Sequence, residues 1–412
     1  MSDNLTLRIA RRCFLLALFV VPFSTALTNV FVVFTYLSFL PVLFSNGEAR
    51  KEMKSPSSLL AVGLFALIAM SALWSIAPQQ EIVEAIRKYS KLLLIPVGLA
   101  LARHDKTLPR RALSWFVAGT AVLSLSSYLV WLNLMPTGST GWWSAGDANN
   151  AFVFKHHITM GVFLGFAALI CLNYYFYAVS RRARIAAAFG AVFYAFPVMF
   201  LTQGRTGYVV LFVGLVALCV IRFHANWRTL VTSILVAITI FAGFFATSSN
   251  FKLRANQFIS EVEDYSGSRK MNSSGTRLSY YRAGLQLMAA NPVLGLGAGS
   301  FSEGFAPIAK QLWNSDDPHY SVRHQPHSEI ILMGVQLGLV GWLMYFSLIG
   351  SLIVAACKSR SYETDILLLL CIVFGTAAAF NSLLWDAAEG HWFALLAGCL
   401  YGYARHGRVA VS

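Results

Sequence analysis

The stretch "RHQPHSEIILMGVQLGLVGWLMYFSLIGSLIVAA" (residues 323–356) joins a polar beginning to a long apolar run. The apolar part is longer than the roughly 20 residues that a helix needs to cross a bilayer. It is preceded by an arginine, two histidines, a proline and a glutamate. Because charged groups are costly in lipid, we expect these residues to face water or to line a polar cavity.

The rest of the chain has the same character. It is 57% hydrophobic and only 12% charged, whereas soluble proteins contain about 25% charged residues. We therefore predict an all-α polytopic membrane protein with about twelve transmembrane helices, the first of them retained rather than cleaved as a signal peptide. The predicted spans lie near residues 12–28, 30–45, 58–76, 84–102, 112–132, 158–179, 185–203, 207–223, 230–247, 328–356, 365–384 and 392–404.

The basic residues predict the orientation. Most of them fall in alternate loops, which by the positive-inside rule are cytoplasmic, together with both termini. The net charge of +14 is then a consequence of topology, and we expect no nucleic-acid partner. The residues concerned are Arg8, Arg11, Arg12, Arg50, Lys51, Lys54, Arg103, Lys106, Arg110, Arg111, Arg181, Arg182, Arg184, Arg222, Arg228, Lys358, Arg360, Arg405 and Arg408.

The chain (1–412) is predicted to be a single integral membrane domain with one long outer loop, 248–326, between spans nine and ten. A loop of this length usually carries function or structure of its own. Within it, "SSGTRLSYYRAGLQLMAANPVLGLGAGSF" (273–301) predicts a helix that starts at Ser273 or Ser274 and ends at Asn291-Pro292. Arg277 would lie in its first turn, where exposed backbone N–H groups add partial positive charge suited to phosphate.

Spacing on this helix separates two arginines. Arg277, Tyr281, Gly284 and Met288 share one face, whereas Arg282 points elsewhere. The "GLGAG" run at 295–299 follows a helix and a proline instead of a strand, so it predicts a tight turn with close backbone approach and argues against a dinucleotide site.

Arg205, in "LTQGRTGYVVLF" (201–212), stands between two apolar spans with almost no loop. An ionisable group at such depth suggests function; the alternative is an anchor whose charged end reaches the membrane surface. We expect Gly204 and Gly207 to leave the turn open to a ligand. Other arginines and histidines predicted on this side are Arg254, His156, His157, His319 and His391.

His327 could accept a proton or position a hydroxyl, or could simply stabilise the start of the helix. A divalent metal ion is an alternative, because several oxygen and nitrogen ligands lie close together in sequence, although their spacing matches no specific metal motif. We predict no metal and no other cofactor. The ligand set for the metal alternative would be Asp316, Asp317, His319, His324 and His327.

Other polar and aromatic residues are candidates for acceptor or sugar contacts. Trp142 and Trp143 could belong to an aromatic belt at the membrane surface or stack on a sugar face. Asp386 and Glu389, in "LLWDAAEGHW" (383–392), could hold an arginine or contact an acceptor. The remaining candidates for acceptor contacts are Arg323 and His324.

Residues 200–345 resemble the O-antigen ligase family, which also includes O-antigen polymerases and related protein O-glycosyltransferases. Three pieces carry the resemblance: "LTQGRTGY", the arginine helix with its glycine turn at 274–301, and "HSEIILMGVQLGLVG" (327–341). This sequence has Gly204, Ser328 and Gln336 where the family usually has serine, asparagine and glutamate. The arginines and the histidine are intact.

The resemblance implies a glycosyltransferase whose active site is on the periplasmic face of a Gram-negative inner membrane. An O-polysaccharide would pass from undecaprenyl diphosphate to a sugar hydroxyl of the lipid A–core oligosaccharide, with inversion and without a metal. Arg205, Arg277 and, more weakly, Arg282 would then bind the diphosphate, and His327 would orient or deprotonate the hydroxyl.

Three alternatives stay open at this stage. The same chemistry could serve an O-antigen polymerase or a protein O-oligosaccharyltransferase. A polysaccharide or lipid transporter would instead place its charges near the membrane midplane on broken helices within inverted repeats, a pattern that the sequence does not show.

Overall fold

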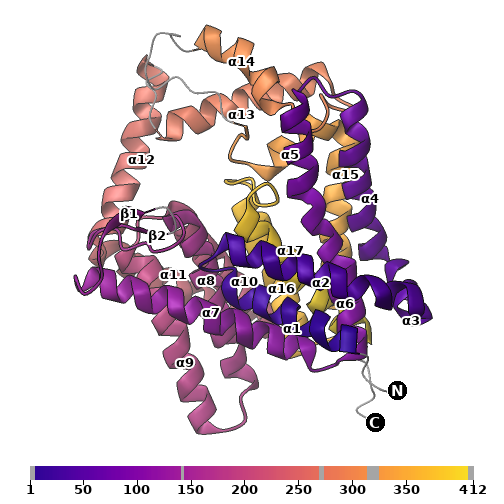
Figure 1. Cartoon of the computed structure of the whole chain (residues 1–412). Coiled ribbons are helices and arrows are strands. Elements are labelled where there is room, and N and C mark those ends of the chain that lie inside the picture. The colour runs from indigo at the N-terminus through magenta and orange to yellow at the C-terminus, as the bar shows by residue number, and fades with distance from the viewer. Residues whose placement is uncertain (1–4, 141–142, 269–272, 313–323, 407–412) are drawn as a thin grey trace.

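The computed structural model describes residues 5–140, 143–268, 273–312 and 324–406, and nearly all of its regular structure is helical (Figure 1). The helices are α1 (Leu5–Val20), α2 (Thr25–Ser45), α3 (Gly47–Met53), α4 (Pro56–Met70), α5 (Gln79–Tyr89), α6 (Leu94–His104), α7 (Leu108–Trp131), α8 (His157–Tyr177), α9 (Arg181–Phe196), α10 (Arg205–Phe223), α11 (Trp227–Thr247), α12 (Ser249–Ser268), α13 (Ser273–Ala290), α14 (Phe301–Leu312), α15 (Glu329–Cys357), α16 (Tyr362–Ala378) and α17 (Ala387–His406). One hairpin pairs the antiparallel strands β1 (Gly138–Thr140) and β2 (Trp143–Ala145).

In the described part of the chain, 8 helices are long and apolar enough to cross a membrane. The protein is therefore an all-α membrane protein, as predicted, while the number of twelve spans stays a prediction. These helices are α2, α4 with the turn that follows it, α7, α8, α9 with the turn that follows it, α10, α11 and α15.

The span predicted at 84–102 is helical throughout, but it changes helix type along its length. The structure divides it into the polar helix α5, a 3-10 turn at Ser90–Leu93 and the short apolar helix α6. Lys91 is buried in the 3-10 stretch and donates from Nζ to the backbone carbonyl of Asp386 at 2.7 Å. A contact so distant in sequence is invisible to a hydropathy profile.

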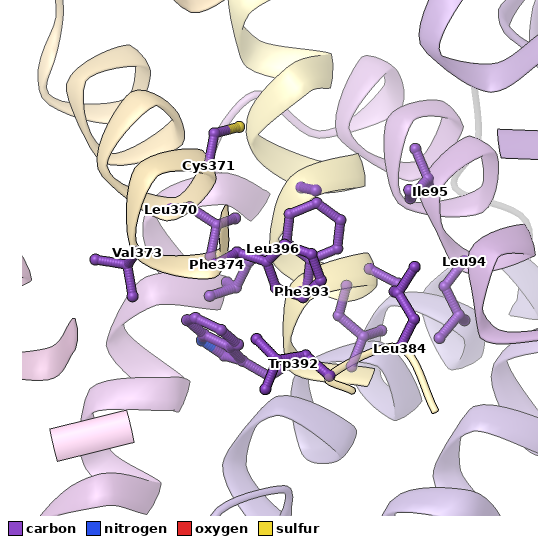
Figure 2. Packing of buried hydrophobic residues seen from close by; sticks show 14 of the residues in the cluster. Leu94, Ile95, Leu370, Cys371, Val373, Phe374, Leu384, Trp392, Phe393 and Leu396 are labelled. Atoms are coloured by element: carbon purple, nitrogen blue, oxygen red, sulfur yellow. The ribbon is translucent and has the colours of Figure 1, made fainter. Parts of the chain in front are cut away.

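The core of the molecule lies where α6, α8, α16 and α17 meet. The rings of Phe374 and Phe393 stack with centroids 3.8 Å apart (Figure 2). The ring centroid of the fully buried Trp392 lies 5.1 Å from that of Phe166. The backbones of α6 and α17 come very close at Gly398. A Cβ at this position would lie only 2.4 Å from the Ile95 carbonyl oxygen, so the approach requires glycine. Small residues at helix contacts are typical of packing in membranes.

The long segment before α15 is largely helical, as predicted, and the helix predicted between Ser273 and Asn291 is confirmed as α13. The shared face of this helix is confirmed as well, since Gly284 and Met288 pack on Ile331 and Gly334 of α15. In Figure 1, α13 extends from the upper end of α12 towards α15, so this segment spans the region above the apolar helices.

The glycine run makes the predicted tight turn. Gly295, Gly297 and Gly299 have φ angles of 67°, 90° and 75°, and Gly297 N donates to the Gln336 carbonyl at 2.9 Å. The turn packs against a break in α15 at Gly338, where φ is 59°. The glycines thus let the chain return close enough to α15 to fix the end of α13.

We expect Gly297→Ala to destabilise the protein strongly. The added Cβ would lie 2.4 Å from Ser75 Cα, and a positive φ alone costs a non-glycine residue about 1–3 kcal/mol. Thermal unfolding in detergent measures the effect. Gly243→Ala in α11, where nothing lies within 4 Å of the new Cβ, is the control. Equal melting temperatures for the two variants would contradict the prediction.

Candidate functional site

Arg205 is the first residue of α10, directly after the turn that ends α9, as the sequence predicts. The glycines beside it have a different role from the expected one. A Cβ on Gly204 would lie 2.7 Å from the His157 carbonyl oxygen, and one on Gly207 would lie 2.9 Å from Gly161 Cα. These glycines therefore let α10 pack tightly on α8, and the expectation that they leave room for a ligand is wrong.

A cavity of about 640 Å³ opens beside Arg205, between α10, α12 and α13. It brings together three arginines from three helices: Arg205, Arg254 and Arg277. None of the described residues that line it is acidic. We call this cavity the arginine pocket. Its other lining residues are mainly apolar or aromatic: Thr206, Tyr208, Val209, Phe251, Ala255, Phe258, Ser274, Leu278, Tyr281 and Phe380.

The three guanidinium groups differ in their partners. Both terminal nitrogens of Arg205 lie 3.1 Å from Glu261 Oε2, and Nη1 donates to Ser274 Oγ at 2.8 Å. Arg254 donates to Gln203 Oε1 and Gln257 Oε1, while its buried Nε lacks a partner among the described residues. A buried donor of this kind points to a missing acceptor.

Arg277 is the least compensated of the three arginines. Within the described residues its guanidinium forms no ion pair, and burial, reinforced by the nearby charge of Arg205, lowers its pKa. An arginine nonetheless stays protonated at physiological pH. Glu261 acts on Arg277 only through space, so a partly buried cation with no ion pair within the described residues makes the pocket attractive to an anionic ligand.

His327 lies next to the arginine pocket. Its backbone carbonyl accepts a hydrogen bond from the hydroxyl of Tyr281, a lining residue, at 3.1 Å. The φ of His327 is 54°, in the left-handed region that non-glycine residues rarely adopt. Such strain persists only where the surroundings impose it, and it concentrates at functional sites. The structure thus places the backbone of His327 beside the pocket that contains Arg205 and Arg277.

Two departures from the family pattern have a structural reason. Ser328 caps α15, with Oγ accepting from Ile331 N at 3.4 Å, and asparagine caps helices equally well. Gln336 is buried and its Oε1 accepts from Gly299 N at 2.8 Å, a bond that a glutamate oxygen could also accept. Both substitutions keep the hydrogen bond that the position needs.

His156 also belongs to the surroundings of the pocket. It immediately precedes α8, and burial, followed by the charges of Arg277 and Arg254, lowers its pKa. The sequence places His156 and Arg254 on the outer side but gives no reason to select them. Their proximity to Arg277 arises from the packing of α8 and α12, which no local pattern encodes.

Other predicted residues lie elsewhere. Arg282 is exposed on α13 and does not line the arginine pocket. The His324 side chain is 59% exposed, with Nδ1 2.7 Å from Glu81 Oε1 of α5. The backbone of Trp143 belongs to β2, but its side chain is outside the description. Trp142, Asp316, Asp317, His319 and Arg323 also lie outside the described residues.

Asp386 and Glu389 lie away from the arginine pocket and have a lysine nearby, not an arginine. The Asp386 carbonyl accepts the bond from Lys91, and burial, together with Glu389, raises the pKa of the Asp386 side chain. Glu389 is buried and accepts a hydrogen bond from the Thr159 hydroxyl. Nothing in these contacts tests their proposed part in acceptor binding.

The described residues contain no group of three or more histidines, cysteines and acidic residues placed to hold a metal ion. The proposed ligands Asp316, Asp317 and His319 fall outside that range. The metal alternative from the sequence therefore stays a matter for experiment.

The ion pair of Glu261 and Arg205 makes α12–α13 sensitive to acid. Burial alone would raise the pKa of Glu261, but hydrogen bonds from Ser274 and Arg205 outweigh burial and lower it below 4.5. The stabilisation is then fully present above pH 4.5 and is lost as pH falls through the depressed folded-state pKa. We expect wild type to melt above Glu261→Gln at neutral pH.

Melting curves of the two proteins between about pH 7 and about pH 3 measure this effect. The difference in melting temperature between wild type and Glu261→Gln should decrease as the pH falls. Glu303→Gln, at an exposed position of α14, should behave like wild type throughout. A difference that is constant across this range would show that the carboxylate charge of Glu261 is not the cause.

The described residues thus form a polytopic helical membrane protein with an apolar pocket that three arginines line. The family comparison makes the class specific: residues 190–346 match the O-antigen ligase family model. This match confirms, for that part of the chain, the resemblance that the sequence predicts. No curated protein matches it.

The matched range extends from the middle of α9 into α15 and covers less than half of the chain. It includes Arg205, Arg254, Arg277 and His327, and every lining residue of the pocket except Phe380 lies in the matched range. The family indicates a glycosyltransferase-like enzyme with polysaccharide and lipid substrates.

Proposed function

We propose that the protein is an O-antigen ligase of a Gram-negative inner membrane. In this proposal it transfers an O-polysaccharide from undecaprenyl diphosphate to a sugar hydroxyl of lipid A–core, with the site at the periplasmic face and both termini in the cytoplasm. The observation that carries the proposal is the arginine pocket, where apolar walls and three arginines meet in one cavity.

The pocket matches the two parts of the proposed donor. Its apolar and aromatic walls suit a polyprenyl chain. Its guanidinium groups present paired donors that match the oxygens of a diphosphate. Arg277, which forms no ion pair within the described residues, and the unpartnered Nε of Arg254 are the groups most ready to receive such an anion.

The chemistry needs the leaving group to be stabilised. The acceptor oxygen forms a bond to the anomeric carbon while the bond from that carbon to the diphosphate oxygen breaks, and undecaprenyl diphosphate leaves with the electron pair. Fixed cations aimed at the developing charge lower the barrier to this step. Arg205, Arg254 and Arg277 supply three such cations, so a metal ion is not required for this purpose.

His327 is proposed to receive the proton of the attacking hydroxyl. Histidine is the commonest general base near neutral pH. The bond from Tyr281 to the His327 carbonyl links its backbone to the wall of the pocket. Attack from the histidine side, opposite the diphosphate, would invert the anomeric centre.

The decisive test is ligation with purified protein, undecaprenyl diphosphate-linked O-polysaccharide and core-only lipopolysaccharide, with and without EDTA. We expect ligated lipopolysaccharide on a gel in both conditions. Product that disappears with EDTA would refute the metal-independent mechanism and return attention to Asp316 and His319. Donor that is elongated without core acceptor would identify a polymerase, and product that appears only with a protein acceptor would identify a protein O-oligosaccharyltransferase.

A transporter gives a different result. Product formed in detergent, where no membrane separates two compartments, excludes transport as the sole activity. If no product forms with any acceptor although the substrates are active in a known ligase preparation, the proposed function is wrong.

A further inference from the structure

A second cavity lies at the opposite end of the helix bundle from the arginine pocket. It has a volume of about 870 Å³ and opens between the first turns of α7 and α9 and the last turns of α8 and α17. The arginine pocket, in contrast, is at the first turn of α10 and just beyond the last residue of α16. Figure 1 shows α9 at the edge of the molecule opposite α13 and α14.

This cavity, which we call the α7–α9 groove, changes in polarity along the helices. Near the helix ends its lining residues are polar, with Arg110, Tyr177, Ser180 and Arg360 among them. Further along the same helices the lining becomes apolar. The apolar residues towards the middle of the bundle are Leu113, Val117, Ile170, Ala183 and Ala187.

The polar end has an excess of positive charge. Arg110 pairs with Glu363, whose side chain is fully buried, but the Arg110 side chain itself is 69% exposed. Arg360 lies 3.4 Å from Asp365, which is already bonded by Arg222 at 2.9 Å. The guanidinium groups of Arg110, Arg222 and Arg360 therefore share only two carboxylates, those of Glu363 and Asp365.

The donors that remain on these groups can bind an anion. A guanidinium has five N–H donors, and one carboxylate does not use them all. Arg110 lines the groove and is largely exposed, so its remaining donors are accessible to an anion. The tyrosines beside it are typical of the membrane surface, where one end of the ring is apolar and the other is wet.

We propose that the α7–α9 groove binds an anionic membrane phospholipid. The phosphate would lie against Arg110 and Arg360, and one acyl chain would follow the apolar wall formed by α7, α8 and α9. Charge complementarity and the order of polar and apolar residues along the helices support this occupant over a soluble anion, which would leave the apolar wall unused. The proposal is independent of the proposed ligase reaction.

Native mass spectrometry of the full chain in detergent tests the proposal. Protein is incubated with phosphatidylglycerol or with phosphatidylethanolamine, and bound lipid is counted at increasing lipid concentration. We expect wild type to hold phosphatidylglycerol more tightly. Arg110→Gln should lower the apparent affinity about tenfold, as expected for the loss of a charge-assisted hydrogen bond.

Arg110→Gln leaves the buried Glu363 unpaired and could prevent folding, so a second variant fills the groove without touching an ion pair. Ala183→Leu places a larger side chain on the groove wall, whereas Ala186→Leu, exposed on the same helix and outside the groove, is the matched control. Bound phosphatidylglycerol should be lost in Ala183→Leu and kept in Ala186→Leu.

Three results would overturn the proposal. The first is equal lipid retention in wild type and Ala183→Leu. The second is equal binding of phosphatidylglycerol and phosphatidylethanolamine to wild type. The third is retention of inorganic phosphate, added as a further probe, in place of lipid. Because the readout is bound lipid, each result is obtained whether or not the protein ligates a polysaccharide.

Discussion

Arg277→Ala should weaken binding of undecaprenyl diphosphate by about a hundredfold, which corresponds to the loss of two hydrogen bonds to a charged group. The reason is the position of Arg277. It is partly buried in the wall of an apolar cavity and forms no ion pair within the described residues, so its donors are free for the ligand. Arg205, in contrast, must first exchange Glu261 for the diphosphate.

A binding titration with undecaprenyl diphosphate measures this effect. Arg282→Ala is the matched control, because Arg282 belongs to the same helix but is exposed and outside the pocket. Arg277→Lys keeps the charge without the planar fork and should bind with intermediate affinity. If Arg277→Ala and Arg282→Ala bind equally well, Arg277 is not a donor-binding residue.

His327→Ala should lower kcat by about 10²- to 10⁴-fold, the usual contribution of a general base. Donor affinity should change little, because the three arginines of the pocket are untouched. The measurement is the initial rate of ligation, combined with the binding titration described for Arg277. A reduced rate together with intact binding separates a catalytic role from a structural one.

The unusual backbone of His327 requires a control of its own. Asparagine tolerates a positive φ better than most residues but cannot act as a base, so His327→Asn should keep the fold and remain inactive. His324→Ala changes an exposed histidine nearby that contacts Glu81, and it should retain most of the activity. Donor binding lost in both His327 variants would show that His327 supports the pocket structurally.

Several features of the protein follow from its sequence alone, because each depends on neighbours along the chain. The length of an apolar run predicts a membrane helix, as for α8, α10 and α15. A serine before a periodic stretch and a proline after it predict the bounds of α13. Arg205 and Arg277 are prominent in the sequence because both stand at helix beginnings, and the family match includes them.

The pocket itself is decided by the tertiary structure. Arg254 becomes a pocket residue only because α12 packs next to α10 and α13, and Glu261 reaches Arg205 across 56 positions of sequence. Likewise, Gly204 and Gly207 at the start of α10 make contact with α8, a neighbour that local sequence does not reveal. Hydropathy and capping report short-range energetics, whereas these contacts depend on which helices meet.

The division of the predicted span at 84–102 shows the same limit. Its apolar content predicts a helix, but it does not reveal the 3-10 stretch at Ser90–Leu93 or the buried bond from Lys91 to the Asp386 carbonyl. The sequence by itself determined that this chain forms membrane helices and which family motifs it carries. Only the tertiary structure decided which charged groups are compensated, because the partners of a buried charge are chosen by packing between distant segments.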